Sequence, residues 1–145
     1  MALADLSNVL SIFREKEMNA EAQEALFKEV LLMTLARAAS SDANIDPVEL
    51  TTVQAIMKRI VSEEVSDADI RLASRPALFE EAPFGKYLAS VRKRLGSAQR
   101  ASVVGALAEV IKSDTRVSAL EIDFFNMVAK ELQATPAEIA GLSAD

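Results

Sequence analysis

The sequence predicts an all-α protein, a compact helical bundle of about seven to eight helices. Half of its 145 residues are apolar, and only four Gly and four Pro occur, so few residues interrupt a helix. Apolar residues recur at three- and four-residue intervals along most of the chain, which is the spacing that lines one face of a helix. Because a chain of this length usually builds one hydrophobic core, we predict a single domain over residues 1–145.

Each helix is placed by its apolar spacing and by the residues at its ends. The expected helices lie around residues 3–14, 20–39, 47–60, 84–95, 104–111 and 122–132. Short helical pieces are expected around 67–73 and 77–81, and a last short piece begins at Pro136. The second is apolar on nearly all sides after Val30, which indicates a buried central helix. Pro47 and Pro136 suit first helical positions, because Pro lacks the N–H that the first turn leaves unpaired. Gly96 is expected to end the helix that precedes it.

Four apolar stripes mark the longer of these helices. They are Leu50, Val53, Met57 and Ile60; Phe84, Leu88, Val91 and Leu95; Val104, Leu107, Ala108 and Ile111; and Ile122, Phe125, Val128, Ala129 and Leu132. Each stripe lies at helical spacing and predicts the face that its helix buries.

A weak internal repeat relates two parts of the chain, about residues 27–62 and 99–134. Residues 29–60 align with residues 101–132 without a gap, and the loop and core positions match best. Each half should be a buried helix, an acidic loop and an amphipathic helix. Because a lone helical hairpin cannot bury its apolar face, we expect the two halves to pack together around a pseudo-twofold axis.

The composition excludes several classes of function. The formal net charge of −6 opposes binding to phosphate backbones, so we expect no nucleic acid partner. The chain has no Cys and no His, which removes thiolate chemistry and the commonest general base and zinc ligand. We therefore expect no enzymatic activity, and an enzyme that uses paired carboxylates is the less favoured alternative. The basic cluster of Arg92, Lys93, Arg94 and Arg100 is expected to be a solvated face.

No segment predicts a membrane span or a signal peptide. The longest apolar stretch, Val30 to Ala39, is far shorter than the about 20 residues that cross a bilayer. The N-terminal residues MALADLSNVL carry an acid and no basic region before an apolar run. We expect a cytoplasmic protein.

The two loops of the repeat, SSDANIDPVEL and KSDTRVSALEI, predict a cation site. The candidate ligands are Asp42, Asn44, Asp46 and Glu49 in the first loop, and Asp114 and Glu121 in the second. Carboxylate and amide oxygens suit the hard cations Ca²⁺ and Mg²⁺. The first loop is not an EF-hand, because Pro47 and Val53 stand where that motif has Gly and Glu. Arg116 weakens the second loop. If the pseudo-twofold axis brings Asp42 and Asp114 near each other, a site shared between the loops is expected to bind better than either loop alone.

The same acids have a simpler interpretation as helix caps. Asp46 and Ser118 each precede a helix start. Glu49 lies three residues after Asp46, and Glu121 lies three residues after Ser118, which is the spacing of a capping box. Such caps stabilise a helix by about 1 kcal/mol each, which is sufficient reason for their presence. The two loop aspartates can close the turns onto nearby backbone amides.

The paired loops resemble those of the TerB-like family, named for tellurite resistance. Its helix-loop-helix units carry an Asp-Gly loop and a Glu on the following helix, and the same domain is similar to the N-terminal part of DjlA-type co-chaperones. The resemblance covers roughly Phe27 to Leu142. The chain departs from the pattern at Ala43 and Thr115, where the family has Gly, so neither loop has the residue that turns most easily.

The resemblance implies a binding or scaffold module in tellurite or general stress response, whose acidic loop face binds a divalent cation. The alternative is an ion-independent protein–protein interaction domain of the co-chaperone type. For that alternative we expect an exposed apolar patch around Phe79, Phe84 and Tyr87. The expected partners are other proteins, a second copy of the chain among them.

Overall fold

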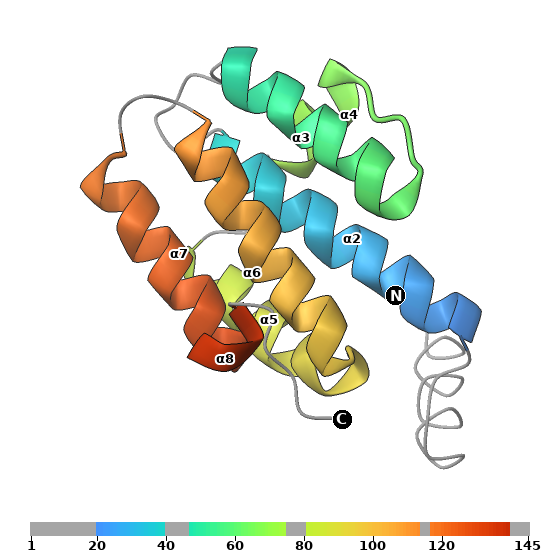
Figure 1. Ribbon diagram of the computed structural model, residues 1–145, viewed down its shortest axis with the longest axis vertical. Helices are drawn as coiled ribbons and strands as arrows, with labels where there is room; N and C mark the ends of the chain where they lie inside the picture. The colour runs from blue at the N-terminus through green and yellow to red at the C-terminus, as the bar shows by residue number, and fades with distance from the viewer. Residues whose placement is uncertain (1–19, 40–46, 75–80, 114–116, 140–145) are drawn as a thin grey trace.

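The computed structural model describes residues 20–39, 47–74, 81–113 and 117–139, and all structural statements below concern these residues. The elements are α2 (Ala20–Ala39), α3 (Pro47–Val61), α4 (Asp67–Ala73), α5 (Glu81–Val91), the 3-10 helix η1 (Arg92–Arg94), α6 (Ser97–Lys112), α7 (Ala119–Glu131) and α8 (Pro136–Ile139). The described residues contain helices and no strand, which confirms the all-α prediction (Figure 1).

The centre of the bundle is made by α2 and α6, which lie side by side (Figure 1). Their shared core is wholly buried, with Val30, Leu31 and Leu35 on α2 and Val104 and Leu107 on α6. Helix α2 buries residues on almost every side along its C-terminal half, as its mostly apolar run after Val30 predicted.

The remaining helices cover this central pair on different sides. Helix α3 packs against both α2 and α6, and α4 packs against α2; α7 and α8 cover α6 on the other side, while α5 packs against α7 (Figure 1). Helix α3 buries Leu50, Val53 and Met57 of its predicted stripe and also Ile56, whereas the predicted Ile60 is only half-buried. These contacts place helices from both parts of the chain around one core.

Helix starts were predicted well. Helix α3 begins at Pro47 and α8 at Pro136, since Pro is preorganised for the first turn. Helix α4 spans the predicted residues, and the Ser66 hydroxyl accepts the Asp69 N–H at 3.0 Å, while the Asp69 carboxylate accepts the Ser66 N–H at 3.0 Å. The predicted helices at 3–14 and most of 77–81 lie outside the described residues, so the total number of helices stays a prediction.

The predicted helix end at Gly96 is wrong. Helix α5 ends at Val91, η1 follows, and Gly96 is the residue that precedes α6. The φ angle of Gly96 is −69°, so it does not take the left-handed conformation with which Gly terminates helices. Its N–H donates instead to Gln99 Oε1 at 3.0 Å, an interaction typical of a helix start.

Candidate functional site

Helices α2 and α6 end at the same end of the bundle at which α3 and α7 begin (Figure 1); we call this the loop end. Four predicted ligands lie outside the described residues: Asp42, Asn44, Asp46 and Asp114. The other two, Glu49 and Glu121, stand in the first turns of α3 and α7.

Glu121 is a buried capping residue. Its N–H donates to the Ser118 hydroxyl at 3.1 Å, and its Oε1 accepts the Ser118 N–H at 3.0 Å, which confirms the predicted capping box. Only 3% of the residue is exposed. Its second oxygen, Oε2, is buried and has no hydrogen-bond partner among the described residues. A buried oxygen without a partner costs about 1–3 kcal/mol, so the cap alone does not account for this position.

Glu49 has a similar place at the start of α3. It is only 5% exposed and lies two residues after Pro47. The described residues contain no group of three or more acids near enough together to hold a metal ion. A metal site with Glu49 or Glu121 therefore requires ligands from outside the described residues.

The same end of the bundle carries exposed aliphatic side chains. They are Val48 on α3, Val117 just before α7, and Leu120 and Ile122 on α7. The prediction that Ile122 belongs to a buried stripe is wrong, because the residue is 49% exposed. Successive residues are about 100° apart around the helix axis. Because Glu121 faces the core, its neighbours Leu120 and Ile122 face outward.

The predicted apolar patch around Phe84 is not exposed. Phe84 is wholly buried; its ring stacks on Tyr87 and Phe124, each with a centroid distance of 6.0 Å. The Arg37 guanidinium lies 4.9 Å from the centroid of the same ring. Burial raises the pKa of Tyr87, and the nearby Glu29 raises it further. Phe84 is thus a core residue, while Phe79 lies outside the described residues.

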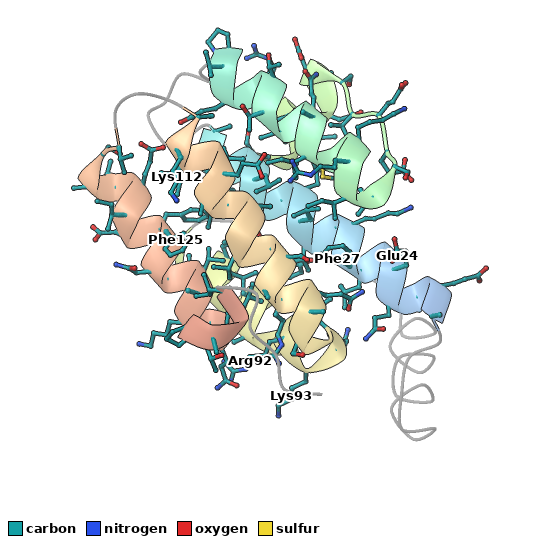
Figure 2. All side chains as sticks on the ribbon, in the orientation of Figure 1. Glu24, Phe27, Arg92, Lys93, Lys112 and Phe125 are labelled. Carbon is teal, nitrogen blue, oxygen red and sulfur yellow. The ribbon has the colours of Figure 1, made fainter. Side chains whose placement is uncertain are left out.

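The basic cluster has a structural role that its sequence did not reveal. Arg92 Nη1 donates to the Glu131 carbonyl at 3.0 Å, and Arg100 Nη1 donates to the Leu132 carbonyl at 3.0 Å. Both arginines satisfy carbonyls that the end of α7 leaves unpaired. The expectation of a merely solvated face is wrong for these two residues. Figure 2 shows Arg92 and Lys93 at the opposite end of the bundle from Lys112.

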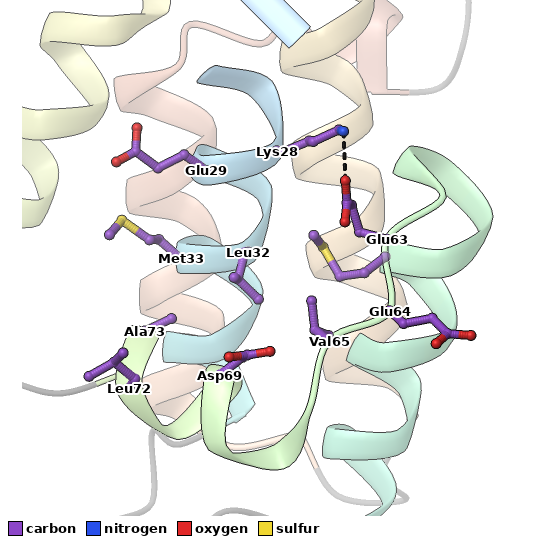
Figure 3. Close-up of a pocket in the computed structure, with 11 residues that line it drawn as sticks. Lys28, Glu29, Leu32, Met33, Glu63, Glu64, Val65, Asp69, Leu72 and Ala73 are labelled. Carbon is purple, nitrogen blue, oxygen red and sulfur yellow. Dashed lines mark hydrogen bonds and ion pairs between the residues drawn. The ribbon is translucent and has the colours of Figure 1, made fainter. Parts of the chain in front are cut away.

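A groove between α2 and α4 is a second candidate site, which sequence reasoning missed. It has a volume of about 470 Å³ and an apolar lining of Leu32, Met33, Met57, Val65, Leu72 and Ala73. Charged residues also line it: Lys28, Glu29, Glu63, Glu64 and Asp69. Figure 3 shows Lys28 on α2 joined to Glu63, beyond the end of α3, by an ion pair of 2.8 Å. Met57 was predicted on the buried stripe of its helix and is 2% exposed, and its side chain still lines the groove.

In the part of the chain that the structure describes, no helix has the length and apolar character needed to span a membrane. Comparison with curated proteins and with solved structures found no match. The family model described as "Tellurite resistance protein TerB" matches residues 28–144, which is most of the chain and includes both loops and both buried glutamates. The chain therefore belongs to the TerB family of tellurite resistance proteins.

Proposed function

We propose that this protein is a non-enzymatic binding module of the TerB type, active in tellurite or general stress response, whose loop end binds Ca²⁺ or Mg²⁺. The proposed ligands are Asp42, Asn44, Asp46, Glu49, Asp114 and Glu121. The observation that carries the proposal is the buried Glu121 Oε2, which has no hydrogen-bond partner among the described residues.

The two capping boxes of the chain show which features of Glu121 are due to capping and which require another explanation. Ser66 with Asp69 and Ser118 with Glu121 make the same pair of capping hydrogen bonds. Asp69 is exposed, whereas Glu121 is 3% exposed. Water satisfies the second oxygen of an exposed cap, but a buried carboxylate needs a partner to offset the loss of hydration. A cation offers that partner.

The proposed repeat accounts for a site shared between the loops. It relates Glu49 to Glu121 and Asp42 to Asp114, and both glutamates belong to first turns at the loop end. Two carboxylates alone bind hard cations weakly. Loop ligands from both halves complete a set of oxygen donors, and the second loop's Arg116 makes the first loop the main contributor.

The test is a titration of the full chain with CaCl₂ and with MgCl₂, followed by amide NMR. Wild type is compared with Asp42→Asn and Glu121→Gln, and Asp69→Asn is the matched control because it alters the cap that is exposed. We expect saturable shifts in residues 39–49 and 113–122, weakened by both loop-end variants and unchanged by the control. Spectra that stay constant at millimolar cation would overturn the proposal.

The second candidate is an ion-independent protein-interaction domain of the DjlA N-terminal type. The exposed aliphatic residues of the loop end favour it, since Leu120 is 63% exposed and Val48 53%, and exposed apolar side chains that gather on one surface often mark a protein interface. This candidate predicts that Leu120→Ser abolishes binding to a protein partner or to a second copy while chelators have no effect. Sensitivity to chelators would favour the cation-dependent module.

A further inference from the structure

The groove between α2 and α4 has features of a peptide-binding site that are independent of the loop end. It is formed by α2, α4 and the C-terminal end of α3, whereas the acidic loops precede the N-terminal ends of α3 and α7 in the sequence. Its volume of about 470 Å³ lies within the range of about 300–1,000 Å³ that is typical of binding pockets. It is therefore large enough for several apolar side chains of a partner.

The lining is apolar and adaptable. Figure 3 shows Leu32 on α2 and Val65 on the connection before α4 on opposite sides of the groove, with Leu72 at one edge. Leu72 is 53% exposed, so a partner that covers it would remove apolar surface from water, which favours binding. The thioethers of Met33 and Met57 also line the groove, and flexible Met side chains fit varied apolar surfaces.

The charged residues around this lining determine whether a positively or a negatively charged partner is favoured. Four carboxylates and one ammonium group line the groove. Lys28 is already paired with Glu63 at 2.8 Å, and Glu64 is paired with Lys58 at 3.0 Å. Negative charge remains in excess, so a ligand with positive charge beside an apolar stripe is complementary to it.

We propose that the groove binds a basic amphipathic helix of a partner protein. The described residues offer no strand edge with which an extended peptide could pair, so the helix-in-groove mode applies, with apolar side chains at helical spacing in the groove. Lys or Arg side chains of that helix then lie beside Glu29, Glu63, Glu64 and Asp69.

The probe is a synthetic peptide of about 18 residues made of Leu and Lys, with Leu at i, i+3, i+4 and i+7. A peptide with Glu in place of Lys and a scrambled Leu/Lys peptide are the ligand controls. Binding to the full chain is measured by fluorescence anisotropy at two salt concentrations, and by methyl NMR of Met33 and Met57. We expect saturable methyl shifts with the basic amphipathic peptide and none with either control peptide.

Two matched pairs of variants locate the site. Leu72→Ser should weaken binding about tenfold, while Leu120→Ser, which alters an exposed leucine outside the groove, should not. Glu63→Gln should weaken binding about two- to fivefold, more at low salt, whereas Glu109→Gln should not. Glu109 is a suitable control because it also forms a surface ion pair, with Arg59 at 2.9 Å.

Two results would overturn the proposal. One is equal weakening by Leu72→Ser and Leu120→Ser, which means that the peptide covers the loop end or binds without a defined site. The other is binding of the scrambled peptide with the same affinity, which means attraction by net charge alone. Neither result depends on divalent cations. The groove proposal can therefore be refuted without refuting the proposed cation site, and the reverse also holds.

Discussion

The substitution Glu121→Gln separates the two roles of this side chain. The amide oxygen of Gln can accept the Ser118 N–H as Glu121 Oε1 does at 3.0 Å, since Gln also serves in capping boxes. The substitution loses the attraction between a carboxylate and the helix dipole, about 0.3–1 kcal/mol. It also replaces a buried charged oxygen that has no partner among the described residues by a neutral amide group, which is less costly to bury. Without a cation, the free energy of unfolding should change by less than about 1 kcal/mol.

With a cation bound, wild type and Glu121→Gln should differ strongly in their free energy of unfolding. At a cation concentration one hundred times the Kd of wild type, binding raises the free energy of unfolding by about 2.7 kcal/mol. Glu121→Gln, which loses one charged ligand, should gain much less. The assay is urea denaturation followed by circular dichroism, with Ca²⁺ or Mg²⁺ and with a chelator. Equal gains in wild type and variant would refute the reasoning that Glu121 is a ligand.

Two further predictions test the core and the exposed cap. Phe84→Ala should lower the free energy of unfolding by about 3–5 kcal/mol, because a wholly buried ring is removed; a loss below about 1 kcal/mol in urea denaturation would restore the surface-patch interpretation. The Ser66 N–H and then the Ser66 hydroxyl lower the pKa of Asp69, so its contribution to stability is present above its unfolded pKa and is lost as the pH falls through the lower folded value. The stability difference between wild type and Asp69→Asn should accordingly be seen at pH 7 and shrink below about pH 4; a difference of constant size would contradict it.

The sequence predicted best what local interactions decide. Pro47, Ser118 and Pro136 each mark a helix start through residues that lie within one helical turn, and α3, α7 and α8 begin there. Gly96 shows the limit of such patterns, because Gly is found both at helix ends and before helix starts. Its φ of −69° and its hydrogen bond to Gln99 distinguish the two, and neither is visible in the sequence.

Features that depend on packing between distant segments were not predicted. Phe84 is buried because Phe124 and Arg37, from two other helices, cover its ring. The groove exists because α4 meets α2 beside the end of α3. A stripe of apolar residues predicts that a helix face is buried, but not which neighbour covers it or where cover is incomplete.

The two capping boxes show why a candidate site cannot be recognised from its motif alone. Ser66 with Asp69 and Ser118 with Glu121 have the same spacing and the same hydrogen bonds. They differ in their surroundings: α4 begins in solvent, while α7 begins where α2 and α6 end, and there Glu121 is buried. The cap explains one carboxylate oxygen in each pair, and solvent explains the second oxygen of Asp69. Neither the cap nor solvent satisfies the second oxygen of Glu121. This unsatisfied oxygen, rather than the acidic motif, is the physical reason to look for a cation at the loop end.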